Sequence, residues 1–477
     1  MIGRKKEQNE LAELYESGKA ELVAVYGRRR VGKTYLINEF FGGEFAFKHT
    51  GLSPAEINGR KTLKAQLDQF YISLKDYGLR GESKPESWQE AFYLLKKLLA
   101  GKSNGERLVV FIDELPWLDT PKSGFITGFE SFWNGWASAQ RDIMVIVCGS
   151  ATSWMKDKLI GNYGGLYGRV TYELYLAPFT LRETEQFFLE KGIEFSRYDI
   201  VESYMIVGGI PYYLGYFKRH LSLAQNVDEL FFKPHAKLED EFNRLFASIF
   251  INPDRIKKIV EFLGSRRFGY KRGDIAEKLG LANNGKLSED IDALISNGFV
   301  VRYIPFGYGG KEVHYKLVDS FCLFYIHFMK NTKKQSQNYW LDNMSSQAVV
   351  VWRGLAFENV CFNHIEQIKN ALKIVGTDSV ESAWVPNTAG RTGGMQIDML
   401  IDRADNVVNL CEIKFYSNEI YVDKEMYLSM QERKAEVEKM ISKKKAVRNT
   451  LITTYGIKKG EYSNIFANVI ILDDLFV

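Results

Sequence analysis

The sequence predicts an α/β fold in several domains, the first of which is built on a parallel β-sheet. At 477 residues the chain is too long for a single compact core. In its first third, apolar runs of strand length alternate with longer amphipathic stretches, which is the pattern of βαβ units. Strands return beyond residue 348 after a mostly helical middle, which indicates a further α/β domain.

The first domain, residues 1–177, is expected to contain four strands and the helices between them. Leu22–Tyr26 is predicted as a buried strand, and Lys33–Phe40 as the helix that follows it. The later elements are strands at 44–47, 108–112 and 144–147, and helices at 62–74 and 88–99.

The middle of the chain is expected to hold two smaller domains. Residues 178–252 lose the strand pattern and are predicted as a helical lid domain. In residues 253–330, three helices at 256–263, 271–279 and 286–296 precede two strands at 299–304 and 312–317, which is the order of a winged helix. A polar stretch at 330–338 is the predicted linker, and a fourth domain covers residues 348–477.

Composition excludes several classes of protein. Hydrophobic residues make up 45% and charged residues 26%, which are ordinary globular values, and the net charge of +4 neither demands nor excludes nucleic acid. No apolar run is long enough for a membrane span and no signal peptide pattern opens the chain, so we expect a cytoplasmic protein. The cysteines form no CxxC pair and are expected to be reduced core thiols: Cys148, Cys322, Cys361 and Cys411.

A phosphate-binding loop is predicted between the first strand and its helix. The segment fits GxxxxGK[ST], in which small residues let backbone N–H groups face phosphates at a helix N-terminus. Lys33 is expected to reach the β- and γ-phosphates of ATP, and the Thr34 hydroxyl to ligate Mg²⁺. The predicted nucleotide-binding residues of the loop are Gly27, Arg28, Arg29, Arg30, Val31, Gly32, Lys33 and Thr34.

Two further strands end in polar residues that complete this site. Residues 108–112 run into Asp113 and Glu114, and we expect Asp113 to hold Mg²⁺ and Glu114 to polarise the attacking water. The strand at 144–147 leads to Ser150, a candidate for sensing the γ-phosphate. The alternative interpretations are a solvated acidic strand end and a simple turn hydroxyl.

Residues 1–250 resemble prokaryotic (archaeal and bacterial) P-loop ATPases related to AAA+ and STAND NTPases. The resemblance rests on Ile2-Gly-Arg-x-x-Glu7, the loop at 27–34, Phe111–Glu114, Gly149-Ser150, Tyr167-Gly-Arg169 and Gly208-Gly-Ile-Pro211. It implies an ASCE/AAA+-like parallel sheet with a helical lid, and it makes Arg4 and Pro211 candidates for the adenine side. Arg169 resembles an arginine that faces the nucleotide or a neighbouring subunit, and the oligomeric state stays open. The crowded arginines at 28–30 depart from the pattern.

The winged helix has two interpretations. Such a module can read DNA with its third helix in the major groove, but that helix here carries three acids against one base, which is poor for meeting phosphate. Basic residues cluster instead at Arg266-Arg267 and Lys271-Arg272. The alternative is a regulatory module that packs on the ATPase core.

In the last domain, a predicted hairpin brings two carboxylates together. If residues 404–406 form its loop, Asp398 faces Glu412, and Lys414 shares a sheet face with Glu412. Two opposed carboxylates repel unless a cation lies between them. Glu358 lies on the inward stripe of the helix that precedes the hairpin, so it also needs a partner.

Residues 348–477 resemble nuclease-like domains of the PD-(D/E)xK superfamily, although the proline is replaced, since Gln396-Ile397 precedes Asp398. The resemblance implies an α/β restriction-endonuclease-like fold. In it Asp398, Glu412 and Glu358 would bind Mg²⁺ or Mn²⁺ and Lys414 would act on the phosphodiester of DNA. Such folds also occur as inert DNA clamps.

Together these features favour an ATP-hydrolysing protein whose nucleotide state positions a metal-dependent nuclease domain on DNA. The competing hypothesis is a STAND-like switch in which an inactive nuclease-like domain binds partners. A third is a DNA-binding regulator that acts through the winged helix.

Overall fold

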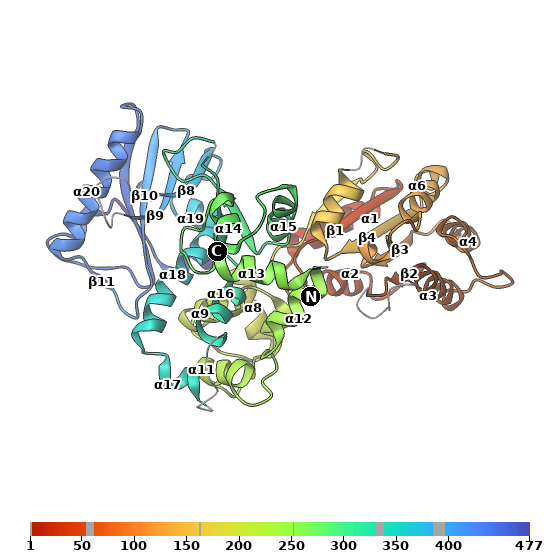
Figure 1. The fold of residues 1–477 in the computed structure, drawn as a ribbon, viewed down its shortest axis with the longest axis horizontal. Helices are drawn as coiled ribbons and strands as arrows, with labels where there is room; N and C mark the ends of the chain where they lie inside the picture. The colour runs from red at the N-terminus through yellow and green to blue at the C-terminus, as the bar shows by residue number, and fades with distance from the viewer. Residues whose placement is uncertain are drawn as a thin grey trace. The chain divides into compact units, whose positions relative to one another are not determined.

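The structure, a computed structural model, describes residues 2–53, 62–161, 164–250, 252–310, 312–330, 338–384 and 396–477. The chain forms two compact units, Met1–Pro178 and Phe179–Val477 (Figure 1). The first unit ends within one residue of the predicted ATPase domain. Most of the predicted linker at 330–338, and Met395 in the predicted hairpin, lie outside the described residues.

The first unit is built on a five-stranded sheet in which every neighbouring pair is parallel, as predicted. Its strand order is β2-β3-β4-β1-β5, so β4 lies between β1 and β3. The strands are β1 (Glu21–Tyr26), β2 (Phe47–Thr50), β3 (Leu108–Asp113), β4 (Ile143–Gly149) and β5 (Tyr172–Tyr175).

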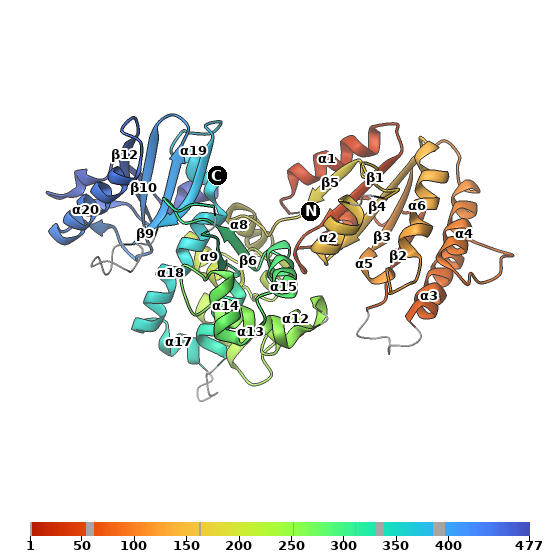
Figure 2. The ribbon, with the colours of Figure 1, turned by 45° about the horizontal axis from the view of Figure 1, so that its top comes forward.

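Helices cover this sheet, and one core joins β1, β3 and β4 to α3, α4 and α6, which Figure 2 shows together on one side. The core is rich in aromatic rings, such as Trp88 and Phe125, which meet edge-on with their ring centroids 5.0 Å apart. The helical elements are α1 (Lys5–Glu16), α2 (Lys33–Phe40), α3 (Thr62–Asp76), α4 (Trp88–Ala100), α5 (Leu115–Leu118), α6 (Phe125–Gly135), η2 (Ala137–Ala139), α7 (Thr152–Trp154) and η3 (Met155–Ile160).

The predicted strand at 44–47 is wrong in position. The chain leaves α2 through Gly42 and Gly43, which both have positive φ, and strand pairing begins only at Phe47. The turn therefore takes up the residues that the apolar pattern had given to the strand.

The second unit begins with helices and a two-stranded sheet, in the predicted order. Three helices, α13 (Pro253–Leu263), α14 (Arg272–Leu279) and α15 (Gly285–Ser296), precede the antiparallel strands β6 (Val300–Tyr303) and β7 (His314–Leu317). The other elements of this part are α8 (Leu181–Glu190), α9 (Arg197–Val207), α10 (Pro211–Leu214), α11 (Leu223–Val227), η4 (Asp228–Phe232), α12 (Glu241–Ile249), α16 (Ser320–Phe324), η5 (Tyr325–Met329) and α17 (Tyr339–Asn343).

The remainder of the second unit holds a mixed sheet of order β14-β12-β10-β9-β8. Strands β8, β9 and β10 are antiparallel neighbours, whereas β12 and β14 continue the sheet in parallel. The strands are β8 (Ser379–Trp384), β9 (Ile397–Arg403), β10 (Val407–Lys414), β12 (Ala446–Thr453) and β14 (Asn468–Ile470), with a separate pair β11 (Ile420–Tyr421) and β13 (Ile457–Lys458).

Helices lie against this sheet as well. Met430 and Val437 of α20 (Lys424–Met440) share a core with Leu400 and Leu410 of the hairpin. Helix α18 (Gln347–Asn363) contacts β10, and Glu358 is buried on it, as its position in the apolar stripe predicts. The remaining elements are α19 (Ile365–Ala371), η6 (Ser463–Ile465) and η7 (Leu472–Phe476).

Buried polar contacts tie α18 to the helices at the start of the second unit. The Arg353 guanidinium contacts the Glu202 carboxylate of α9 at 2.6 Å. The His364 ring accepts a hydrogen bond from the Leu181 N–H at 2.9 Å through Nε2. These contacts join the helical part and the mixed sheet into one body.

All four cysteines are buried and unpaired, which confirms the prediction of core thiols. No helix in the described part of the chain has the length and apolar character needed to cross a membrane.

Candidate functional site

The predicted phosphate loop lies between β1 and α2, and its glycines are required by the backbone. Gly27 has φ 143°, and a Cβ there would lie 2.4 Å from the Leu176 carbonyl oxygen. Gly32 has φ 92° and precedes the first turn of α2, where no side chain caps the helix. The first turn of α2 is therefore a place where backbone N–H groups can meet an anion.

Lys33 lies inside this loop. Its buried ammonium donates hydrogen bonds to the Gly27 carbonyl at 2.9 Å and to the Arg28 carbonyl at 3.0 Å. A lysine held by two carbonyl groups of the loop is a positive charge placed where the phosphates of a nucleotide would lie.

The residue that follows Lys33 meets the acidic end of β3. The Thr34 hydroxyl donates a hydrogen bond to Asp113 Oδ2 at 2.7 Å, and Asp113 Oδ1 accepts one from the Glu114 N–H at 2.9 Å. A hydroxyl and a carboxylate side by side are the oxygen donors that Mg²⁺ prefers. This pair fits a magnesium ion that would also bind the phosphates of ATP.

Glu114 is held beside Ser150, as the strand order requires. Because β4 is the neighbour of β3, the carboxyl ends of both strands meet at one edge of the sheet. Glu114 Oε2 accepts hydrogen bonds from the Ser150 hydroxyl at 2.8 Å and from its N–H at 3.2 Å. Glu114 adopts φ 49°, a left-handed conformation that is uncommon for a residue with a side chain.

Arginines surround the loop. Arg4 is buried and donates to the Val31 carbonyl at 3.3 Å, so the sequence-predicted adenine-side residue does lie against the loop. The guanidinium of Arg29 stands over the Trp117 ring at 5.6 Å, and Arg30 takes a positive φ. Trp117 is a neighbour that the sequence prediction missed.

Two predicted residues lie apart from the loop in the chain, one in each unit. Arg169 is exposed, on the turn that follows Gly168. Pro211 is the first residue of α10 in the second unit, after Gly209, where a Cβ would lie 2.0 Å from the Phe179 carbonyl oxygen. The roles suggested for both residues stay predictions.

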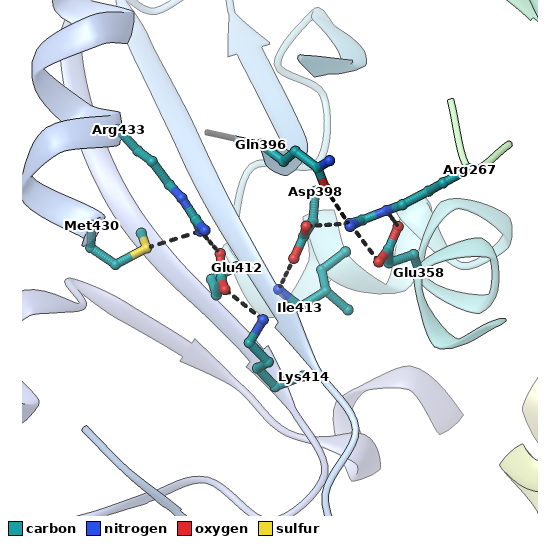
Figure 3. A network of polar contacts seen from close by, with 9 residues as sticks. All are labelled: Arg267, Glu358, Gln396, Asp398, Glu412, Ile413, Lys414, Met430 and Arg433. Carbon is teal, nitrogen blue, oxygen red and sulfur yellow. Dashed lines mark hydrogen bonds and ion pairs between the residues drawn. The ribbon is translucent and has the colours of Figure 1, made fainter. Parts of the chain in front are cut away.

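A second polar cluster lies in the mixed sheet (Figure 3), where Arg267 binds two of the predicted carboxylates. Its Nε donates to Glu358 at 2.7 Å, its Nη1 donates to the Gln396 side chain at 3.0 Å, and its Nη2 contacts Asp398. Asp398 also accepts a hydrogen bond from the Ile413 N–H at 2.9 Å. Burial and the nearby charge of Asp398 raise the pKa of Glu358 to about 7, against the effect of Arg267.

The third carboxylate, Glu412, has cations of its own. Its side chain contacts Arg433 of α20 and lies 2.6 Å from the Lys414 ammonium. The predicted hairpin register is confirmed, since Val408 pairs with Asp402 and Cys411 with Met399, a register that puts Asp398 opposite Glu412 when continued. In the structure these two carboxylates contact separate arginines, Arg267 at Asp398 and Arg433 at Glu412.

The donors in this cluster are of the right kind for Mg²⁺ or Mn²⁺, and in this arrangement arginine side chains contact them. Over the described ranges, no three His, Cys, Asp or Glu side chains lie where they would share a metal. Metal binding by Glu358, Asp398 and Glu412 therefore stays a prediction.

Arg433 was missed although the sequence carries a signal for it. It lies three residues after Met430 and four before Val437, the two buried residues of α20, and so belongs to the inward stripe of that helix. Arg267 was noted only as part of a basic cluster. Nothing local connects it to Asp398, 131 residues further along the chain.

Comparison with known proteins supports the first site. Residues 1–217 match a family described as an ATPase domain predominantly from Archaea. An uncharacterized protein of Methanocaldococcus jannaschii is 26% identical over 331 residues, which are 69% of this chain and 68% of that protein.

Two solved structures are similar in part. The Walker-type ATPase of Pyrococcus abyssi has 19% identity and a TM-score of 0.46, over 69% of this chain and 96% of its own. The ORC2 protein of Aeropyrum pernix has 14% identity and a TM-score of 0.39, over 72% and 94%.

The family match covers every residue of the loop, of the Thr34–Asp113 pair and of the Glu114–Ser150 pair. The chain therefore carries a P-loop ATPase domain and is an enzyme that hydrolyses ATP.

Proposed function

We propose that the nucleotide state of the ATPase domain controls a C-terminal nuclease-like domain, residues 348–477, that binds or cleaves DNA with a divalent metal. The observation that carries the proposal is the convergence of Glu358, Asp398, Glu412 and Lys414 at neighbouring positions of α18, β9 and β10. Each of the three carboxylates is at least nine-tenths buried. Burying three acids is costly even when cations meet them, so their presence favours a function over a purely structural role.

The order of elements supports the same proposal. A helix carrying a buried acid precedes an antiparallel hairpin, and the long helix α20 then leads to a strand parallel to β10. The segment at 253–330, with its three helices and hairpin, would be a winged helix that connects the lid to this domain. Helices α8 to α12 would be the lid that closes over ATP.

The chemistry at the ATPase end follows from the residues there. Lys33 and the first turn of α2 would bind the phosphates, with Thr34 and Asp113 on the metal side. Glu114, oriented by Ser150, would accept a proton from the attacking water. Loss of the γ-phosphate would then release the contacts that hold the lid.

The test is cleavage of linear, supercoiled and branched DNA with Mg²⁺ or Mn²⁺, with and without ATP. Wild type is compared with Asp398→Asn and with Lys33→Ala. The matched control is Asp402→Asn, which makes the same change on the same strand, where Asp402 contacts Lys445 instead. We expect Asp398→Asn to abolish cutting, Asp402→Asn to retain it, and Lys33→Ala to remove its response to ATP.

One observation favours a second candidate function, a STAND-like switch whose C-terminal domain is inactive and binds partners. Arg267 and Arg433 already neutralise the acids that a metal would need. This candidate predicts tightly retained nucleotide, slow turnover and no effect of DNA on ATP hydrolysis. No cutting of any DNA by a protein that hydrolyses ATP would favour it over the first.

A further inference from the structure

A small basic cavity lies next to the acid cluster in the second unit. It measures about 100 Å³, room for about three water molecules or one tetrahedral oxyanion. Its walls come from the end of α13 and the residues that follow it, from β7, from α16 and η5, and from α18. The lining side chains that carry or accept a positive charge are Arg266, Arg267, Lys316 and His327, and no carboxylate lines it.

Two of these cations, Lys316 and Arg266, make no direct ion pair with a carboxylate in the described parts of the chain. Lys316 stands over the Phe362 ring at 5.4 Å, and Arg266 stands over the Tyr270 ring at 5.5 Å. Ring faces attract a cation but leave its N–H donors without oxygen acceptors. These donors remain available to an anion.

A residue that lines the cavity also carries a buried neutral donor. Trp352 lines it and is 3% exposed, and its indole N–H is buried with no acceptor among the described residues. Such groups are rare in folded proteins because an unmet donor costs free energy. An oxyanion in the cavity would provide acceptors for these donors.

The surroundings of Lys316 also disfavour the charged form of its ammonium group. Burial and the nearby charge of Arg267 together lower the pKa of Lys316 to about 8, against the attraction of Glu358 and Asp398. An anion bound beside it would favour the charged form. The electrostatic state of the lysine thus agrees with the geometry of the cavity.

We propose that this cavity binds a phosphate group of the DNA backbone, with Lys316, Arg266 and the indole of Trp352 as its donors. The proposal rests on the proposed function and specifies where the nucleic acid would be held. Arg267 lines the cavity and binds Glu358 and Asp398, so a phosphate there would lie beside the acid cluster and compete for its arginine.

The experiment measures binding of a fluorescent DNA duplex by the full-length chain in EDTA, over a range of salt concentrations. The variants are Lys316→Met and Arg266→Gln. The matched control is Arg272→Gln, an exposed arginine of the same segment that donates to Ser288 and does not line the cavity. A parallel calorimetric titration uses inorganic phosphate.

We expect each cavity variant to weaken DNA binding about tenfold and to lower the salt slope by about one, while the control changes neither. If wild type binds no DNA but binds inorganic phosphate, and Lys316→Met loses it, the phosphate site stands and the proposed function fails. If both variants bind DNA and inorganic phosphate as wild type does, the proposed site is refuted. Far-ultraviolet circular dichroism of each variant checks that it is folded.

Discussion

The buried ion pair between Arg353 and Glu202 should be decisive for the stability of the second unit. Its atoms lie 2.6 Å apart, and the two side chains are 10% and 3% exposed. Arg353 also donates to the Met344 carbonyl at 2.8 Å. Burial raises the pKa of Glu202, and the charge of Arg353 acts against that rise, so the arginine favours the ionised carboxylate.

Arg353→Met keeps most of the side-chain volume but leaves the Glu202 carboxylate without its cation. Removing one partner of a buried pair costs about 3–5 kcal/mol. Protonation of Glu202 limits that cost. Once the pKa of the stranded carboxyl exceeds the solution pH, the group takes up a proton and no longer buries a charge. Adding Glu202→Gln removes the stranded charge, so the double variant should recover about half of the loss or more.

The assay is urea unfolding, with hydrogen exchange in α9 and α18 to assign the transition to the second unit. The control is Arg197→Met. Its side chain is 40% exposed, and its ion pairs with Glu185 and Asp473, which are 23% and 63% exposed, should each contribute about 1 kcal/mol or less. The reasoning is refuted if Arg353→Met costs no more than this control. It is also refuted if the double variant is no more stable than Arg353→Met.

Three further predictions follow from single contacts. Glu114→Gln should still bind ATP, yet lower the rate of phosphate release about 100-fold, because the base is lost; an unchanged rate would contradict the role of Glu114. Gly27→Ala should weaken ATP binding about tenfold or more, since its Cβ would lie 2.4 Å from the Leu176 carbonyl oxygen, whereas Gly101→Ala meets only contacts of 3.6 Å and should bind normally in the same titration. His364 accepts a hydrogen bond through Nε2, and burial lowers its pKa to about 4, so folding requires the neutral ring. Its contribution to the free energy of unfolding is complete above about pH 6.5, the pKa of histidine in the unfolded chain. About 3 kcal/mol of this stability is lost as the pH falls toward 4. Unfolding of His364→Gln measured at both ends of this range should lack that dependence.

Local sequence determined the parts of this protein that depend on short stretches of chain. The glycines and the lysine of residues 27–34 specify a loop whose backbone geometry permits few alternatives, and the helix after it begins and ends as predicted. The three-residue loop of the C-terminal hairpin likewise determines the register that puts Asp398 opposite Glu412. Helical periodicity was sufficient to predict that Glu358 is buried.

The partners of these residues were decided only by the tertiary structure. The position of β4 between β1 and β3 brings Ser150 to Glu114, and no local pattern encodes strand order. Arg267 reaches Asp398 across 131 residues, and Arg433 reaches Glu412 from a helix that the hairpin does not specify. The periodicity of side chains along a helix or strand follows from backbone geometry over a few residues, so the sequence alone predicts which side of an element faces inward. Which charged side chain lies opposite depends on how distant segments pack. The fold brings Arg267 and Arg433 to the acids, and the metal expected there stays a prediction.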